Sequence, residues 1–163
     1  MACGCCTISS PRRARMVEIN FYHLTRSALD EVLPELLEKT LARGWRAVVL
    51  AGSTERVEAL NQQLWTYRSD SFLPHGSAKD GLAAQQPVWL THLDERPNAA
   101  EVLFLLDGMV TAQPEIYLRV CEVFSDTEAE AVSAARVRWK EYQTAGHMLS
   151  YWQQGERGWE KKQ

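Results

Sequence analysis

An apolar run at residues 45–51 (WRAVVLA), bounded by Gly44 and Gly52, is the feature that most constrains the fold of this chain. A strand covered on both faces has such a continuous run, whereas a strand with one face in water alternates apolar and polar residues. Covered strands of this kind belong mainly to parallel sheets, and parallel neighbours are joined by crossover helices. The run therefore predicts an α/β fold.

Other segments also have the pattern of strands. Period-two alternation predicts the first and the last of them, and short apolar runs predict those between. Together with residues 45–51, the expected strands are residues 17–24, 87–93, 101–106 and 117–124. Residues 68–86 have neither pattern, and we expect a long irregular stretch there.

Apolar residues at helical spacing predict three helices. The first contains Pro34, which is tolerated only in a first turn, so its regular part is expected to begin near Leu33 or to bend there. The second is expected over residues 55–67. The third is expected to open with the capping box Ser125-x-x-Glu128.

The order β-α-β-α-β-β-β-α indicates a single three-layer, Rossmann-like α/β domain with a mostly parallel central sheet flanked by helices. We expect residues 16–150 to form this domain, preceded by a disordered extension at residues 1–15 and followed by a polar tail at residues 151–163. Outside the extension the only cysteine is Cys121, in an apolar strand pattern. A single buried cysteine fits a protein of the reducing cytoplasm.

The charge balance excludes some classes of partner. Without residues 1–15, which hold three arginines and no acid, 15 cations remain against 21 acids, a net charge of −6. Such a body offers no basic groove, so we expect no direct contact with nucleic acid. No stretch approaches the roughly 18 consecutive apolar residues that cross a bilayer, so no membrane partner is expected either.

Rossmann-like topology raises the question of a nucleotide, but no phosphate-binding loop is present. Neither GxGxxG nor GxxxxGK[ST] follows the first two expected strands, and no His or Cys spacing suits a metal, so no cofactor is expected. The enzymatic alternative is a small α/β hydrolase or nucleotide-binding enzyme. Its site would contain His92, Asp94 and Asp107 at the carboxyl edge of the sheet, although no nucleophile accompanies them.

The expected last helix combines an apolar stripe with a cationic pair. Arg136 and Lys140 are four residues apart and therefore share one face, beside the edge formed by Val132 and Trp139. Such a surface suits a ligand that is both anionic and apolar, for example a peptide ending in an aromatic residue with a free carboxylate. The alternative is an ordinary amphipathic helix whose basic residues lie in its last turns, where they favour the helix dipole.

Several short motifs, spread along the chain, are shared with one known family. They are FYHL at residues 21–24, GWRAVV at 44–49, ALNQQLW at 59–65, SFLPH at 71–75 and VRWKEYQTAG at 137–146. In this combination, residues 17–150 resemble the chi subunit of bacterial DNA polymerase III holoenzyme.

The resemblance implies a non-catalytic adaptor with a Rossmann-like fold that uses no nucleotide. Chi subunits link the clamp-loader complex, through the psi subunit, to the acidic C-terminal tail of single-stranded DNA-binding protein, which ends in an aromatic residue. The tail-binding positions correspond to Arg136, Trp139, Lys140, Ser125 and Met148, with Leu149 as an alternative to Met148. Some members have a lysine at the position of Val132, and many have an apolar residue at the position of Ser125. The resemblance therefore implies that this chain binds the tail more weakly or in a different orientation.

A second surface is implied by the aromatic positions that contact psi, or a helicase in its place. They correspond to Trp65 and Phe72. Trp65 is at helical spacing from Val57 and Leu64, so it could equally be a core residue. Phe72 lies in a polar, turn-rich segment and is followed by Leu-Pro, as an interface anchor would be.

Overall fold

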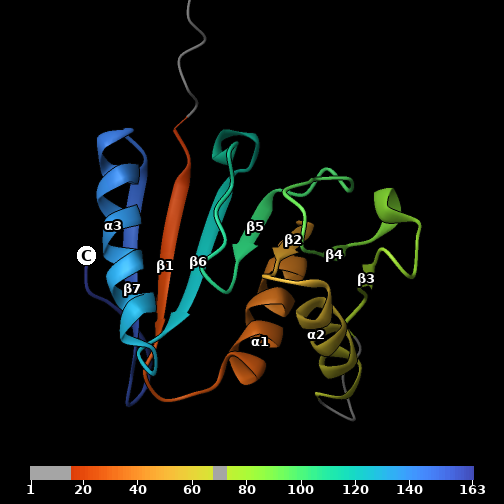
Figure 1. The fold of residues 1–163 in the computed structure, drawn as a ribbon, viewed down its shortest axis with the longest axis horizontal. Coiled ribbons are helices and arrows are strands. Elements are labelled where there is room, and N and C mark those ends of the chain that lie inside the picture. Colours follow the sequence, from red (N-terminus) through yellow and green to blue (C-terminus); the bar gives the residue numbers. More distant parts are fainter. Residues whose placement is uncertain (1–15, 68–72) are drawn as a thin grey trace, which may run out of the picture.

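The computed structural model describes residues 16–67 and 73–163, which form an eight-stranded sheet with helices on both faces (Figure 1). The strands are β1 (Glu18–Leu24), β2 (Ala47–Leu50), β3 (Gly76–Ser77), β4 (Val88–Thr91), β5 (Val102–Leu105), β6 (Arg119–Ser125), β7 (Met148–Gly155) and β8 (Gly158–Lys161). The helices are α1 (Leu29–Ala42), α2 (Thr54–Thr66) and α3 (Ala129–Thr144), with 3-10 turns at Ala83–Gln85 and Pro114–Ile116. The predicted α/β architecture is confirmed. Within these residues, no helix has the length and apolar character needed to span a membrane.

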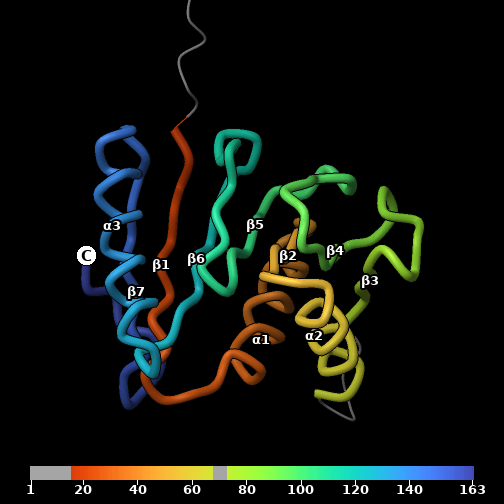
Figure 2. The backbone as a smooth tube through the Cα atoms, viewed as in Figure 1, coloured from red at the N-terminus to blue at the C-terminus, as the bar shows by residue number. Residues whose placement is uncertain are grey.

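The strand order is β3-β4-β2-β5-β6-β1-β7-β8, and neighbours are parallel except for β7 and β8. The first strand therefore lies inside the sheet, between β6 and β7. In Figure 2 the blue C-terminal segment runs beside the red β1. Phe21 of β1 is opposite Glu122 of β6 on one side and Tyr151 of β7 on the other.

Residues 151–163 are part of the sheet and do not form the expected polar tail. They belong to an antiparallel hairpin of β7 and β8, in which Gln153 lies opposite Glu160. The side-chain oxygen of Gln154 accepts hydrogen bonds from the backbone amides of residues 25–27 at 3.0 to 3.1 Å. The polarity of this segment predicted a tail, but Gln154 finds its hydrogen-bond partners far away in the sequence.

Two apolar cores lie on opposite faces of the sheet. The first is formed between the sheet and helices α1 and α2, with Leu33, Leu37 and Leu60 among its fully buried side chains. The second lies under α3, where Ala135 is buried against strand residues such as Phe21. Along β2, alternate residues enter the two cores, which explains the continuous apolar run on which the fold prediction rested.

Helix α1 begins at Leu29 and contains Pro34 in its second turn, so it does not start near Leu33, which was one of the two expected alternatives. Pro34 has no N–H to donate to the carbonyl of Asp30. The side-chain amide of Gln63, from α2, donates to that carbonyl instead. A contact between the two helices thus satisfies the group that the proline leaves unpaired, and the helix continues through it.

Helix α3 does not open with the expected capping box. Ser125 is still the last residue of β6, and the helix begins at Ala129 with Glu128 at the N-cap and no side-chain capping bond. The hydroxyl of Ser125 instead accepts the N–H of Thr127 at 3.3 Å. The pairing of β6 with β1 extends to Ser125, which leaves a turn between strand and helix. Gly146, with φ +85°, follows the end of α3.

Candidate functional site: an aromatic pocket between α3 and the C-terminal hairpin

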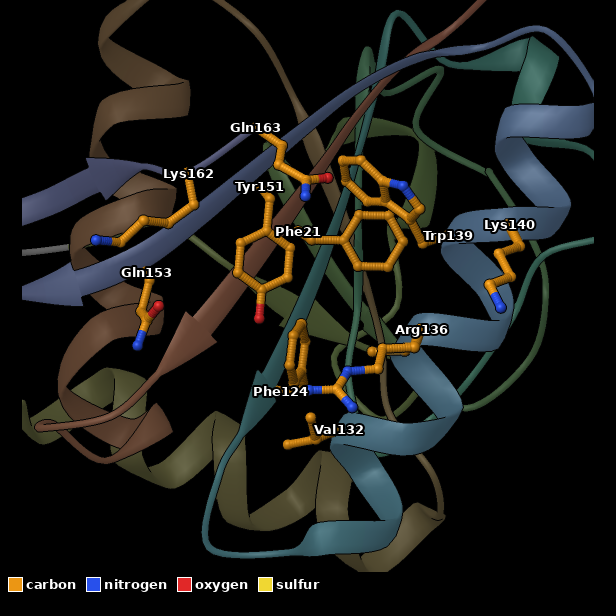
Figure 3. A pocket seen from close by; sticks show the side chains of 11 residues that line it. Phe21, Phe124, Val132, Arg136, Trp139, Lys140, Tyr151, Gln153, Lys162 and Gln163 are labelled. Atoms are coloured by element: carbon orange, nitrogen blue, oxygen red, sulfur yellow. The ribbon is translucent and has the colours of Figure 1, made fainter.

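A pocket with a volume of about 540 Å³ opens between α3 and the β7–β8 hairpin (Figure 3). We call it the α3–β7 pocket. It is lined by Phe21, Phe124, Val132, Ala135, Arg136, Trp139, Lys140, Tyr151, Gln153, Lys162 and Gln163. The lining contains cations, amides and aromatic rings but no aspartate or glutamate. Its size is that of sites that enclose a small ligand or a short piece of peptide.

Aromatic rings from three neighbouring strands and α3 pack together in the pocket. The centroid of Phe21 lies 5.2 Å from that of Trp139 and 6.4 Å from that of Phe124, both in edge-to-face geometry. The ring of Tyr151 is 6.0 Å from Trp139 and 6.2 Å from Phe124. Because β6, β1 and β7 are adjacent, residues far apart in sequence form one continuous aromatic surface.

His23 connects this surface to Tyr151. Its ring stacks on Phe124 at 4.9 Å, and its Nδ1 is hydrogen-bonded to the Tyr151 hydroxyl at 2.7 Å. Burial lowers the pKa of His23, and the positive charge of Arg136 lowers it further, against the opposing effect of Asp126. His23 is therefore neutral at pH 7 and holds the tyrosine ring in place without adding a charge to the pocket.

Cations from α3 border the aromatic surface. Arg136 and Lys140 are exposed, and neither has an ion-pair partner within the described part of the chain. In Figure 3 the Arg136 side chain extends toward Phe124. The structure thus brings Arg136, Trp139 and Lys140 together in one pocket, as the spacing on the helix predicted. Such a site can bind a carboxylate through its cations while an apolar ring of the same ligand lies against the aromatic surface.

The opposite side of the pocket was missed by the sequence analysis. Tyr151 and Gln153 come from β7, and Lys162 and Gln163 follow β8. The backbone N–H of Lys162 donates to the carbonyl of Tyr151 at 2.7 Å, so the hairpin pairing continues past β8. The alternation of Leu149, Tyr151 and Gln153 is a weak strand signal that could have indicated β7, but nothing local indicates that it pairs with β1.

Arg138, from the same helix, has a structural role. It forms an ion pair with Glu122 of β6 in which the arginine side chain is 12% exposed and the glutamate side chain 3%. Burial raises the pKa of Glu122 to about 7, although the attraction and the hydrogen bond of Arg138 act to lower it. The pair joins α3 to the sheet beside the pocket and leaves Arg138 unavailable to a ligand.

Two other predicted site residues do not line the pocket. Ser125 lies at the end of β6 with its hydroxyl engaged by Thr127. Met148 is 60% exposed, and because side chains alternate along a strand it lies on the face of β7 opposite to Tyr151. Leu149, the alternative to Met148, packs into the core under α3.

The second predicted surface lies on the other face of the sheet. Trp65 on α2 is 54% exposed, so it is not a core residue, and its ring lies 4.9 Å from that of His75. His75 is buried, and its ring nitrogens contact the carbonyls of Leu73 and Asn61 at 2.6 and 3.2 Å. Phe72 lies outside the described residues.

The residues of the enzymatic alternative are engaged in separate loops. Asp94 accepts hydrogen bonds from the hydroxyl of Thr111 and the N–H of Ala112 at 2.8 and 2.9 Å. Asp107 accepts from the N–H of Gly52 at 3.1 Å and pairs with Arg56. His92 is exposed. Among the described residues there is no group of three or more His, Cys, Asp or Glu side chains that could hold a metal ion.

Comparison with known proteins connects this architecture to DNA replication. Residues 16–150 match the model of a family described as DNA polymerase III chi subunit, HolC. A probable DNA polymerase III subunit chi from Rickettsia prowazekii is 33% identical over 91 residues, which cover 56% of this chain and 55% of that protein, so the match spans about half of the relative. DNA polymerase III subunit chi from Escherichia coli is 24% identical over 76% of this chain and 84% of its own length. The protein of that name from Pseudomonas aeruginosa is 26% identical over 82% of this chain and 94% of its own length.

Proposed function

The chain belongs to the DNA polymerase III chi subunit family, and on that premise we propose that it is a non-catalytic adaptor of the replicative holoenzyme in the bacterial cytoplasm. In this proposal it links the clamp-loader complex to single-stranded DNA-binding protein. The α3–β7 pocket would bind the acidic C-terminal tail of the latter protein.

The observation that carries the proposal is an aromatic pocket bordered by two cations that have no ion-pair partner among the described residues. The tail ends in an aromatic residue that bears the chain carboxylate. Its ring would lie against Phe21, Phe124 and Trp139, and its carboxylate would be bound by Arg136 or Lys140. The charged side chains among the lining residues are all cationic, which favours an anionic ligand over a cationic one.

The link to the clamp loader would use the other face of the sheet. Trp65 contributes exposed aromatic surface there, on α2, and Phe72 follows it by a few residues in the chain. Because α2 and α3 lie on opposite faces, a psi subunit or a helicase on α2 and a tail on α3 could be bound at the same time. This arrangement is what an adaptor requires.

The test is fluorescence anisotropy with a short labelled peptide that copies the C-terminus of single-stranded DNA-binding protein from the same organism. We expect saturable binding that weakens as salt is raised, because charge-assisted contacts of exposed cations are screened. Arg136→Ala and Lys140→Ala should each weaken binding about tenfold, as loss of a hydrogen bond to a charged group does. Arg157→Ala is the matched control, because Arg157 is exposed in the turn between β7 and β8.

A peptide without its terminal aromatic residue should not bind measurably. If both α3 variants bound the intact peptide as tightly as the wild type, the assignment of the site would be wrong. If the wild-type protein did not bind the peptide at low salt, the proposed adaptor function of this pocket would be refuted.

A further inference from the structure

The α3–β7 pocket has a cation on its second side as well, and it comes from a segment beyond the family match. The family model matches residues 16–150, whereas Lys162 lies after β8. Figure 3 shows Lys162 and Gln153 on one side of the pocket and Arg136 and Lys140 on the other, with the aromatic rings between them. Because cations lie on both sides of the pocket, only a ligand with more than one anionic group can contact the cations of both sides.

The register of the hairpin determines which of its side chains face the pocket. In the antiparallel pair, Gln153 is opposite Glu160. Beyond β8, the carbonyl of Tyr151 accepts from the N–H of Lys162, and the N–H of Tyr151 donates to the carbonyl of Gln163. Directly opposed residues share a face, and so do residues two apart in one strand. Tyr151, Gln153, Glu160 and Lys162 therefore lie on the pocket face. Lys161 lies between Glu160 and Lys162 in sequence and belongs to the other face.

Unlike Arg136 and Lys140, Lys162 has a partner within the hairpin. Its ammonium lies 3.0 Å from a carboxylate oxygen of Glu160, and the two side chains are 48% and 54% exposed. An ion pair this exposed contributes little to stability, so exchanging one carboxylate partner for another has a small energetic cost. A carboxylate that enters the pocket can replace Glu160 at Lys162.

We propose that Lys162 is a specificity-determining residue that binds an acidic side chain preceding the terminal aromatic residue of the peptide, and that Glu160 occupies Lys162 while the pocket is empty. This inference rests on the proposed function. The cations of α3 bind the terminal carboxylate of the peptide. Lys162 of the hairpin segment binds the acidic side chains that precede it. Glu160 acts as an internal competitor that makes binding selective for peptides with sufficient negative charge.

The experiment compares two labelled peptides in the anisotropy assay: the acidic tail peptide, and a version in which every acidic side chain is replaced by its amide while the terminal carboxylate is kept. Lys162→Ala should weaken binding of the acidic peptide about threefold to fivefold, as expected for one solvent-exposed charge pair. It should leave binding of the amide peptide unchanged. Lys161→Ala, on the other face, should change neither, and Arg136→Ala should weaken both.

The competitor role of Glu160 has its own variants. Glu160→Gln should tighten binding of the acidic peptide about twofold to threefold, because the exposed ion pair no longer competes. The gain should disappear in the Lys162→Ala background. Glu156→Gln is the matched control, since Glu156 is exposed in the hairpin turn and carries the same charge. If it tightened binding equally, the effect would come from net charge alone and the competitor role would be refuted.

The outcomes separate this inference from the proposal on which it rests. If the acidic peptide binds, Arg136→Ala weakens it and Lys162→Ala does not, the role of Lys162 is refuted and the proposed function stands. If Lys162→Ala weakens both peptides equally, the lysine does not read the acidic side chains and the inference is again wrong. If the acidic peptide does not bind the wild-type protein at all, the proposed function itself fails.

Discussion

Replacing Glu122 by glutamine should change how the stability of the domain depends on pH. Glu122 is buried beneath α3 and paired with Arg138, and burial raises the pKa of its carboxyl from 4.5 to about 7. The folded state therefore binds the Glu122 proton more tightly than the unfolded state does. As the pH rises through 4.5 the unfolded state loses this proton first, so the free energy of unfolding falls until the pH passes 7.

The magnitude follows from the two pKa values. A difference between 4.5 and about 7 corresponds to roughly 3 kcal/mol at about 1.36 kcal/mol for each pKa unit. Part of this is already lost at pH 5 and nearly all of it by pH 8, which leaves a fall of about 2 to 3 kcal/mol across that range. Glu122→Gln removes the titrating group but keeps an oxygen that can accept the hydrogen bond of Arg138.

The assay is urea denaturation of both proteins at several pH values between 5 and 8, followed by tryptophan fluorescence. The free energy of unfolding of the wild type minus that of the variant should fall by about 2 to 3 kcal/mol over this range. His23, whose pKa is lowered by burial, contributes stability that is lost as the pH falls through 6.5, but it is present in both proteins and cancels. A difference that stays constant within about 0.5 kcal/mol would refute the reasoning.

Three further outcomes are expected. Asn98→Ala should lower the free energy of unfolding by about 1 to 3 kcal/mol in urea denaturation, because it removes the side-chain hydrogen bonds to the carbonyls of Ala47 and Gln86, the first of them buried. Gly146→Ala should lower it by about 1 kcal/mol, since an alanine is strained at φ +85°, while peptide affinity stays unchanged. Trp139→Ala should weaken binding of the aromatic peptide at least tenfold by anisotropy, as loss of a buried aromatic anchor does, and unchanged affinity would show that the ring is not part of the site.

Local patterns were sufficient for much of the fold and for one side of the candidate site. The apolar run at residues 45–51 indicated a strand covered on both faces, and β2 has alternate side chains in two cores. The spacing of Arg136 and Lys140 placed them on one face of a helix because residues four apart in a helix are neighbours whatever the rest of the chain does. Trp139, one residue before Lys140, was correctly grouped with them.

Local patterns failed wherever a distant partner satisfied a residue. Pro34 lies within α1 because Gln63 of another helix donates to the carbonyl that the proline leaves unpaired. Ser125 has the spacing of a helix cap, but pairing with β1 keeps it in a strand. Arg138 lies between Arg136 and Lys140 in the sequence and carries the same charge, and only its position over the sheet shows that it is bound to Glu122.

The sequence by itself determined the three helices, five of the strands and the chemistry of α3, since periodicity and helical spacing act over a few residues. The tertiary structure alone decided that this helix borders a pocket. Tyr151 reaches His23 across 128 residues of sequence, and the hairpin that carries Lys162 gains its place by pairing with the first strand. Strand order depends on which backbones hydrogen-bond to one another and on the burial they achieve together. A local pattern of polar and apolar residues does not contain that information.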